Sequence, residues 1–493
     1  MLYPTKEEVK NLLLSYKTVP VFYETLIDSC TPVGLFAALK ERFDNCFILE
    51  SVDNSDQWGR YSFIGIDPKM EIQICGDEAK IIKGTADGVN CEVKKCPNPI
   101  ELFNSILSKR TSPVFLNRPK LTGGLIGYFG YDTVRRFEKK LVNVPEDDLK
   151  MPDSNMFLYD EIVAYDHLAN KAIIILNINE GDDVDRAYDK CLKRSAEIGQ
   201  ILGKAGAAPQ SGGNGKEITV KSNVTKEEYM EMVEKAKEHI IDGDISQVVL
   251  SQRFEIDNPP APFDVYRMLR ATNPSPYLYY FDHENYCIAG ASPEMLVNVT
   301  DGAVVTKPIA GTIGRGKDEA EDKAFEQQLL GDPKERAEHT MLVDLGRNDV
   351  GRVCSFGTVN VTDFMRVERY SKVMHLVSDV QGQLAPDKTA LDALMSVLPA
   401  GTLSGAPKVR AMEIIDELEN KKRGLYGGTV GYLAFSGNID TCIAIRTVLF
   451  RNGKAYVQAG AGIVYDSVPE KEYEETKNKA LAVINAINEA ANL

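Results

Sequence analysis

The chain has 493 residues, which is more than a small single domain needs and enough to enclose an active site in a large core. Its net charge of −15 makes nucleic acid and anionic membrane surfaces poor partners. No run of about 18 apolar residues is present, so we expect no membrane-spanning helix. The nine cysteines form no CxxC pair and the N terminus lacks a signal-peptide pattern, so we expect a cytoplasmic protein with reduced thiols.

The first 200 residues predict a mixture of strands and helices. Thr5 and Glu8 form a capping box at the start of an amphipathic helix, and a second helix is expected at 183–202. Apolar runs and turn residues predict strands at 19–27, 47–52, 61–66 and 70–82, and a hairpin over 160–178 that turns near Asn170. Residues 203–217 are rich in Gly, Ala, Pro and Ser and predict a flexible linker.

The second half begins with another capping box, formed by Thr225 and Glu228. Helices are expected at 319–330, 333–346 and 469–491. Asp301 and Gly302 are typical of a hairpin turn. Strands are expected at 247–256, 277–282, 286–291, 295–299, 303–307, 372–380, 429–435, 441–450 and 455–463.

Hairpins dominate over strand–helix–strand units in this pattern. We therefore expect an α+β fold with large antiparallel β-sheets packed as a sandwich and helices outside. The linker divides the chain into an N-terminal region, 1–202, and a C-terminal region, 218–493.

Two acidic pairs could hold a cation. Glu335 and Glu338 lie three positions apart, and Glu472, Glu475 and Lys479 follow at offsets of three and four, so each set shares a helix face. Two carboxylate pairs from two helices suit Mg²⁺, which takes few protein carboxylates and keeps water or substrate oxygens in its shell. A solvated acidic surface explains the spacing equally well.

Other segments could contribute to a site. Gly460, Ala461 and Gly462 end a predicted strand, where closely spaced glycines let backbone N–H groups approach an anion, or simply form a tight turn. His375 lies in an apolar strand and is either a core residue or a tuned base. Glu294 follows a strand and is either a general acid or an ordinary turn carboxylate. No phosphate-loop pattern is present, so we expect no ATP site.

Taken together, these segments resemble the chorismate-utilising enzymes, the family of anthranilate, aminodeoxychorismate, isochorismate and salicylate synthases. The matching stretches occur in the family's order from about residue 247 to the C terminus. They are Ala-Ser-Pro-Glu at 291–294, Pro-Ile-Ala-Gly-Thr at 308–312, residues 335–349, Leu-Ser-Gly-Ala-Pro-Lys at 403–408, Gly-Leu-Tyr-Gly-Gly at 424–428, and residues 459–479.

The resemblance implies a binding site for chorismate, a dianion. Glu338 and Glu475 look like direct Mg²⁺ ligands, and Glu335 and Glu472 look like ligands through water; the metal would hold the ring carboxylate. The second carboxylate would lie in a clamp at the opposite end, because two separated positive sites also orient the substrate. The clamp and the further substrate contacts are Arg446, Lys479, Gly460, Ala461, Gly462, Gly311, Thr312, Thr402 and Tyr426.

The resemblance also implies the roles of the acid and the base. Ammonia would add at ring C2 while Glu294 protonates the departing 4-hydroxyl group, and His375 would then remove the C2 proton as pyruvate leaves. Members that use water carry a Lys base at the position of Gln247, and aminodeoxychorismate synthases carry a Lys at the position of Ala310. Both positions therefore point to the anthranilate synthases, which are lyases of tryptophan synthesis.

Two further expectations concern regulation and supply of ammonia. The segments Leu-Glu-Ser at 49–51 and Asn-Pro-Ser-Pro-Tyr at 273–277 resemble those that bind feedback tryptophan in this family, which implicates Glu50, Ser51, Asn273, Pro274, Ser275, Pro276 and Tyr277. No Cys lies in a Gly-x-Cys-x-Gly turn, so ammonia must come from solution or from a separate glutamine amidotransferase subunit. The alternatives are an aminodeoxychorismate synthase and an inactive tryptophan-binding regulatory protein.

Overall fold

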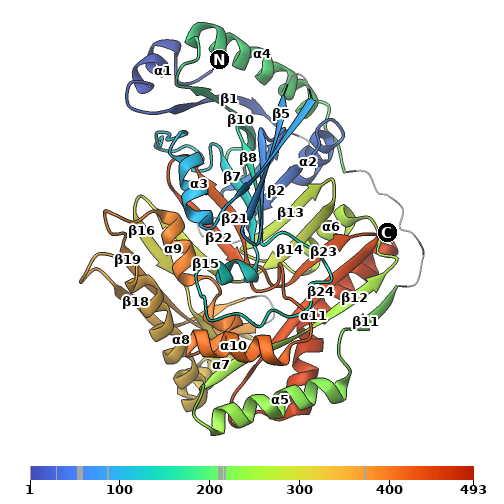
Figure 1. Ribbon diagram of the computed structural model, residues 1–493. Helices are drawn as coiled ribbons and strands as arrows, with labels where there is room; N and C mark the ends of the chain where they lie inside the picture. Colours follow the sequence, from blue (N-terminus) through green and yellow to red (C-terminus); the bar gives the residue numbers. More distant parts are fainter. Residues whose placement is uncertain are drawn as a thin grey trace.

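The computed structural model describes residues 2–28, 30–52, 59–85, 88–208, 215, 218–370 and 373–493. Its centre consists of two 12-stranded antiparallel sheets (Figure 1). In the first sheet the strand order is β1 (Thr18–Leu26), β10 (Lys171–Asn179), β9 (Glu161–Asp166), β3 (Tyr61–Ile66), β2 (Cys46–Glu50), β13 (Tyr277–His283), β14 (Tyr286–Ser292), β23 (Thr447–Arg451), β24 (Lys454–Ile463), β12 (Gln247–Asp257) and β11 (Thr219–Ser222), with β20 (Gly405–Ala406) also paired to β12.

The second sheet is built in the same way. Its order is β17 (Ile309–Gly314), β19 (Val373–Gln383), β16 (Ala303–Thr306), β15 (Met295–Thr300), β22 (Ile439–Ile443), β21 (Thr429–Ala434), β7 (Gly124–Phe129), β8 (Ser154–Tyr159), β4 (Met70–Cys75), β5 (Glu78–Thr85) and β6 (Gly88–Lys95), with β18 (Asn360–Arg369) also paired to β19. The α+β fold with large antiparallel sheets is confirmed.

Helices cover the outer faces of both sheets. They are α1 (Lys6–Leu12), α2 (Pro32–Lys40), α3 (Pro99–Leu107), α4 (Val184–Leu202), α5 (Lys226–Ile241), α6 (Pro262–Thr272), α7 (Glu319–Gly331), α8 (Pro333–Gly351), α9 (Ala390–Val397), α10 (Lys408–Leu418) and α11 (Pro469–Ala491), with short 3₁₀ turns η1 (Tyr131–Arg136) and η2 (Gly401–Leu403). No helix among the described residues is long and apolar enough to cross a membrane.

The two sheets pack face to face through an aromatic core. Phe47 on β2 contacts Tyr159 on β8 edge to face, with ring centroids 4.7 Å apart. Phe157, Tyr128 and Tyr279 belong to the same buried cluster, to which both sheets contribute. Burying one such side chain contributes about 1.5–3 kcal/mol, so this layer is a main source of stability.

Both sheets combine strands from the two halves of the chain. In the first sheet β2 pairs with β13, placing Glu50 opposite Leu278. In the second sheet β7 pairs with β21, placing Phe129 opposite Thr429. The predicted linker at 203–217 begins directly after α4, and most of it lies outside the described residues. Neither sheet follows the predicted division into 1–202, 203–217 and 218–493. That division therefore stays a proposal about regions of the sequence.

Two predicted strands prove to be pairs of strands. The strand expected at 70–82 is the hairpin β4–β5, because Gly76 takes a positive φ of 57° and turns the chain. The strand expected at 441–450 divides into β22 and β23, which belong to different sheets. Arg446 lies between them with a positive φ of 51°. Both strands are buried, so the apolar run is continuous in sequence. The sequence therefore gives no sign that the chain passes from one sheet to the other at this point.

The predicted helix starts and hairpin turns agree with the structure. Thr5 with Glu8 and Thr225 with Glu228 form complete capping boxes. Asn170 takes a positive φ of 49° between β9 and β10. Helix α8 continues to Gly351, five residues beyond the expected end.

Candidate active site

The candidate site lies where the chain passes between the two sheets. Glu294 follows β14 of the first sheet and precedes β15 of the second, and Arg446 lies in the reverse crossing from β22 to β23. The two crossings are hydrogen-bonded to each other: the Ala291 N–H donates to the Arg446 carbonyl at 3.2 Å, and the Ile443 N–H donates to the Glu294 carbonyl at 3.0 Å. Sheet pairing therefore fixes both charged residues in one place.

Glu294 has the environment of a general acid. Burial raises the pKa of its carboxyl from 4.5 to about 7, even though a hydrogen bond from Thr402 and the positive charges of Lys479 and Arg446 act in the opposite direction. The Thr402 hydroxyl donates to Glu294 Oε1 at 2.9 Å. A carboxyl group with this pKa holds a proton for a substantial fraction of the time at neutral pH, so it can donate one.

His375 has the environment of a general base. Burial lowers the pKa of its imidazole below 6.5, so the ring is neutral at neutral pH. Its Nδ1 lies 3.1 Å from the Gly311 carbonyl and 3.0 Å from the Thr312 hydroxyl. A carbonyl only accepts hydrogen bonds, so Nδ1 carries the proton and Nε2 keeps the lone pair that a base needs.

The four predicted metal ligands come from α8 and α11. Burial raises the pKa of Glu338, and the negative charges of Glu335 and Glu475 raise it further. Burial likewise raises the pKa of Glu472, with a contribution from Glu475. These mutual effects place the carboxylates of the two helices within electrostatic range of one another.

A cation would relieve this repulsion. Lys479 already bonds to Glu475 Oε1 at 2.6 Å and donates to the Gly460 carbonyl at 3.0 Å. Among the described residues, no three His, Cys, Asp or Glu side chains converge tightly enough to form a complete metal cage. Mg²⁺ binds through one or two carboxylates and keeps several water or substrate oxygens, so a loose pair of carboxylate pairs fits this ion.

Buried hydrogen bonds fix the two acidic helices on the sheets. Thr476 on α11 accepts a 2.6 Å bond from Gln252 on β12, one residue along from Glu475. His339 on α8 lies 2.7 Å from the Ser378 hydroxyl on β19, one residue along from Glu338. These bonds fix the rotation of each helix about its own axis, and so fix the direction in which Glu338 and Glu475 point.

The glycines of β24 form a narrow wall of the site. A Cβ atom on Gly460 would lie 2.7 Å from the Tyr426 hydroxyl, and one on Gly462 would lie 2.7 Å from Gln247 Nε2. A Cβ atom on Gly460 would also lie 2.9 Å from the Leu250 carbonyl, so only glycine fits there, whereas a side chain at position 462 would require Gln247 to move. Beyond Val457, β24 pairs with β12 but no longer with β23, so among the described residues one edge of this stretch has no strand beside it. The side chain of Ala461, between the two glycines, is buried on the other face of the sheet.

Gly311 connects the base to the acidic helices. Its φ is 72°, and a Cβ atom there would lie 3.1 Å from Glu335 Oε2. Glu294 and His375 both lie within electrostatic range of Arg446, and Glu294 and Glu338 both lie within range of Lys479, so these predicted residues belong to one region. Gln247 also belongs to this group, and its Oε1 is buried without a hydrogen-bond partner among the described residues.

Sequence reasoning missed a buried ion pair beneath the site. Arg423 donates to Glu419 Oε2 at 2.9 Å and also to the carbonyls of Leu403 and Val249, at 2.6 and 2.7 Å. Glu419 in turn accepts bonds from the Ser251 N–H and hydroxyl, each at 2.8 Å. Glu419 and Arg423 are four positions apart, but α10 ends at Leu418, so helical spacing does not predict this pair. Only the fold reveals that it holds the η2 turn and β12 in place.

The two segments expected to bind tryptophan lie side by side. The Val52 N–H donates to the Ser275 carbonyl at 3.2 Å, because β2 and β13 are neighbours. Glu50 is buried and accepts bonds from the Tyr266 hydroxyl and from Arg270 Nε, the latter at 2.9 Å. The remaining members of the two segments are Ser51, Asn273, Pro274, Pro276 and Tyr277.

The chain was compared with known proteins. It is 50% identical over the whole of both chains to anthranilate synthase component 1 of Acetivibrio thermocellus, and 46% identical over 96% of both chains to that of Pseudomonas aeruginosa. Its structure is similar to that of anthranilate synthase component I from Streptococcus pneumoniae, with a TM-score of 0.77 and 41% identity over 88% of this chain and 94% of that one.

A more distant structure shares the fold alone. The menaquinone-specific isochorismate synthase of Escherichia coli matches with a TM-score of 0.67 at 18% identity, covering 98% of both chains. The profile of chorismate binding enzymes matches residues 44–485, which is most of the chain. The protein therefore belongs to the chorismate-binding enzyme family.

Proposed function

We propose that this chain is the large subunit of anthranilate synthase, which converts chorismate and ammonia to anthranilate, pyruvate and water. The observation that carries the proposal is that Glu294, a carboxyl group with a pKa raised to about 7, and His375, a neutral base, lie in one site beside two cationic side chains. A full-length relative that shares half of this sequence is named anthranilate synthase component 1.

The charged ends of the site fit a dianion. Arg446 and Lys479 would hold the enolpyruvyl carboxylate at the open edge of β24. At the other end Mg²⁺, held directly by Glu338 and Glu475 and through water by Glu335 and Glu472, would supply positive charge for the ring carboxylate. Two anchors at a fixed separation orient the ring between the acid and the base.

Glu294 acts in the first step. Ammonia adds to ring C2 and the 4-hydroxyl group departs, taking the Glu294 proton and leaving as water. Hydroxide alone is a poor leaving group, so this proton transfer lowers the barrier. The Thr402 hydroxyl holds the carboxyl in position through its 2.9 Å bond.

His375 acts in the second step. Its Nε2 takes the C2 proton while the C–O bond to the enolpyruvyl group breaks and the ring becomes aromatic. The departing enolate takes up one proton to become pyruvate, and the imidazolium of His375 loses one, so the step balances. Gly311 and Thr312 hold the ring through Nδ1, which keeps Nε2 unprotonated. Gln247 cannot deprotonate water, which favours ammonia as the nucleophile.

The proposal is tested by anthranilate fluorescence with purified protein, chorismate, Mg²⁺ and ammonium. We expect fluorescence that EDTA abolishes and excess Mg²⁺ restores. The variant Glu338→Gln should need much more Mg²⁺ for half-maximal activity, whereas Glu474→Gln, on the exposed face of α11, should behave as wild type. Activity that is unchanged by EDTA would contradict the metal assignment.

Ammonia supply and regulation complete the proposal. We infer that a glutamine amidotransferase subunit delivers ammonia to this chain in the cytoplasm, so glutamine alone should not support activity of the isolated chain. We also infer that L-tryptophan binds Glu50, Ser51 and the segment 273–277 as an inhibitor. Calorimetric titration with tryptophan checks this, and Ser51→Ala should weaken binding; inhibition that is absent or unaffected by the substitution would count against the site.

A further inference from the structure

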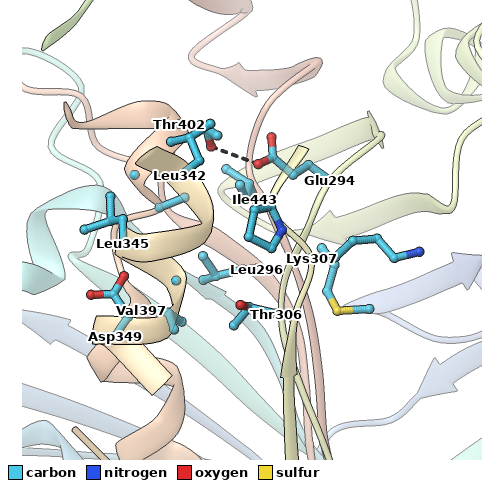
Figure 2. A pocket seen from close by; sticks show the side chains of 15 residues that line it. Glu294, Leu296, Thr306, Lys307, Leu342, Leu345, Asp349, Val397, Thr402 and Ile443 are labelled. Carbon is cyan, nitrogen blue, oxygen red and sulfur yellow. Dashed lines mark hydrogen bonds between the residues drawn. The ribbon is translucent and has the colours of Figure 1, made fainter. Parts of the chain in front are cut away.

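A cavity lies beside Glu294 and Thr402 (Figure 2). Its volume is about 50 Å³, and Glu294 and Thr402 form one wall. The other walls come from β15, β16, α8 and the segment before η2. None of Arg446, Lys479, His375 and the four proposed metal ligands lines it. Most of its lining residues therefore have no part in the proposed substrate contacts.

Two buried polar atoms of the cavity wall lack a partner among the described residues. Thr306 is 6% exposed and Asp349 is 4% exposed, yet Thr306 Oγ1 and Asp349 Oδ1 make no hydrogen bond within the protein. Figure 2 shows the Thr306 hydroxyl directed toward the cavity. Leaving such a group dry costs about 1–3 kcal/mol, so two of them together indicate a polar occupant.

The second oxygen of Asp349 is held by a buried lysine. Lys408 Nζ lies 2.6 Å from Asp349 Oδ2 and also donates to the Val397 carbonyl at 3.2 Å. Both residues belong to stretches that resemble the family, 335–349 and 403–408, and neither has a part in the proposed mechanism. The pair fixes a charged acceptor at the inner end of the cavity.

We propose that this cavity holds ordered water molecules that return a proton from solvent to Glu294 after each catalytic cycle. A buried water needs roughly 10–15 Å³ and two to four polar partners, so the space suits about three molecules. Thr306 and Asp349 provide partners on one side and Glu294 and Thr402 on the other. The role of the waters rests on the proposed function of Glu294, whereas their presence does not.

The proton balance closes over one cycle. Glu294 gives one proton to the departing hydroxyl group, and its carboxylate then takes one from the nearest water. Each water takes a proton from the next, and the last takes one from solvent, which the half-buried residues Leu345, Gly346 and Lys307 place within reach. The ammonium group formed at ring C2 releases one proton to solvent, so no net acid is consumed.

Charged side chains lie at both ends of this route. Lys479 and Arg446 face Glu294 from the substrate side, and Lys408 and Arg352 lie near Asp349. Lys307 is paired with Glu368 at 3.2 Å and points away from the cavity (Figure 2). Thr306 is thus a positioning residue: it holds water and touches neither substrate nor metal.

The first test is a crystal structure of the full chain at a resolution that shows ordered water. We expect electron density within hydrogen-bond distance of both Thr306 Oγ1 and Asp349 Oδ1. An empty cavity would overturn the proposal. This result does not depend on what reaction the protein catalyses.

The second test compares Thr306→Val with Thr306→Ser in the anthranilate assay. Val keeps the shape and removes the hydroxyl, so kcat should fall about tenfold or more, within the range of proton-transfer effects, with KM for chorismate unchanged and a larger solvent isotope effect. Ser keeps the hydroxyl and should recover most of the loss. If the cavity is dry, Thr306→Val instead raises the melting temperature and leaves kcat unchanged, which overturns the relay.

The failure of the proposed function gives a different result. In that case wild-type protein forms no anthranilate, and the comparison of kcat values cannot be made, but the density in the cavity still decides whether the water site exists. Active wild type with identical kcat and isotope effect in Thr306→Val refutes the relay alone.

Discussion

Glu294 and His375 both lie in apolar surroundings, and burial shifts each pKa toward the neutral form of the side chain. The shift is upward for the carboxyl group, to about 7, and downward for the imidazole. Desolvation always disfavours the charged form, so one physical cause produces an acid and a base in the same site. The division of labour between these residues follows from burial at the level of the single side chain.

Replacement of the acid should abolish most of the activity. Glu294→Gln keeps the shape and the bond with Thr402 but cannot donate a proton to the hydroxyl group, so kcat should fall by roughly 10²–10⁴-fold. Steady-state kinetics at fixed concentrations of free ammonia measures this. In wild type, kcat/KM at fixed ammonia should fall as pH rises above about 7. Full activity of the Gln variant would refute the acid role.

The same carboxyl group should destabilise the fold at high pH. Its folded pKa of about 7 exceeds the ordinary 4.5, so the folded state binds the extra proton between these values. Stability from this group is present below about pH 4.5 and is lost as pH rises through 7. Urea denaturation should show that Glu294→Gln gains stability over wild type at pH 8 relative to pH 5. A difference that does not vary with pH would contradict the raised pKa.

Replacement of the base should change the product. In the proposed mechanism His375 acts only in the second step, so His375→Gln should still add ammonia but should stop before the ring becomes aromatic. We expect chorismate to be consumed without anthranilate fluorescence, and mass spectrometry should detect a non-aromatic amino compound that retains the enolpyruvyl group. Thr312→Val, which removes only one contact of Nδ1, should still form anthranilate more slowly. Normal anthranilate production by His375→Gln would rule out the base role.

Among the elements, the η2 turn and strand β12 carry Thr402 and Gln247, and one guanidinium group joins them. Arg423 and Glu419 are almost fully buried, with side chains 1% and 4% exposed. Arg423 bonds to carbonyls on both elements, and Glu419 bonds to β12. Breaking this pair would therefore loosen Thr402, the hydrogen-bond partner of Glu294, together with β12, the strand that pairs with β24.

Arg423→Met should destabilise the protein by about 3–5 kcal/mol, because it leaves Glu419 buried without its cation. The double variant Arg423→Met with Glu419→Leu should recover part of this loss, since both charges are then gone. Chemical denaturation with activity measured in parallel separates stability from catalysis. Arg347→Met, which breaks an exposed pair with Asp344, is the matched control and should cost less than about 1 kcal/mol. Equal effects at both positions would refute the structural role of Arg423.

The elements also show what the sequence can and cannot predict. Helix starts at Thr5 and Thr225 were predictable because the capping signal is local. The division of the apolar run at 441–450 into two strands was not predictable, because the sequence is apolar on both sides of Arg446. The acidic pairs were predictable from their helical spacing, whereas their meeting across α8 and α11 depends on how both helices pack on the sheets.

The residues that support the site could not be predicted, because their contacts also depend on how distant elements pack. Asp349 and Lys408 lie 59 positions apart, and their 2.6 Å contact requires α8 and the start of α10 to meet. The resemblance to a family supplied the roles of individual residues, and the spacing alone left them open. Tertiary contacts of this kind carry no periodic signal in one sequence.

In the whole molecule, the two halves of the sequence are interleaved in both sheets. The pairs β2–β13 and β7–β21 join strands from either side of the predicted linker. Residues 1–202 and 218–493 should therefore not fold separately, and the intact chain should unfold in one cooperative transition. Circular dichroism and calorimetry of the chain and of the two fragments, alone and mixed, test this. An independently folded, active 218–493 fragment would contradict the interleaved core.

The most direct test of the account is the stoichiometry of the reaction products. Purified protein with chorismate, Mg²⁺ and ammonium should yield anthranilate and pyruvate in equal amounts, each matching the chorismate consumed, as measured by chromatography and an enzymatic pyruvate assay. Consumption of chorismate with neither aromatic product nor pyruvate would assign the chain to another reaction of the family. No consumption at all would contradict the enzymatic role proposed for Glu294 and His375.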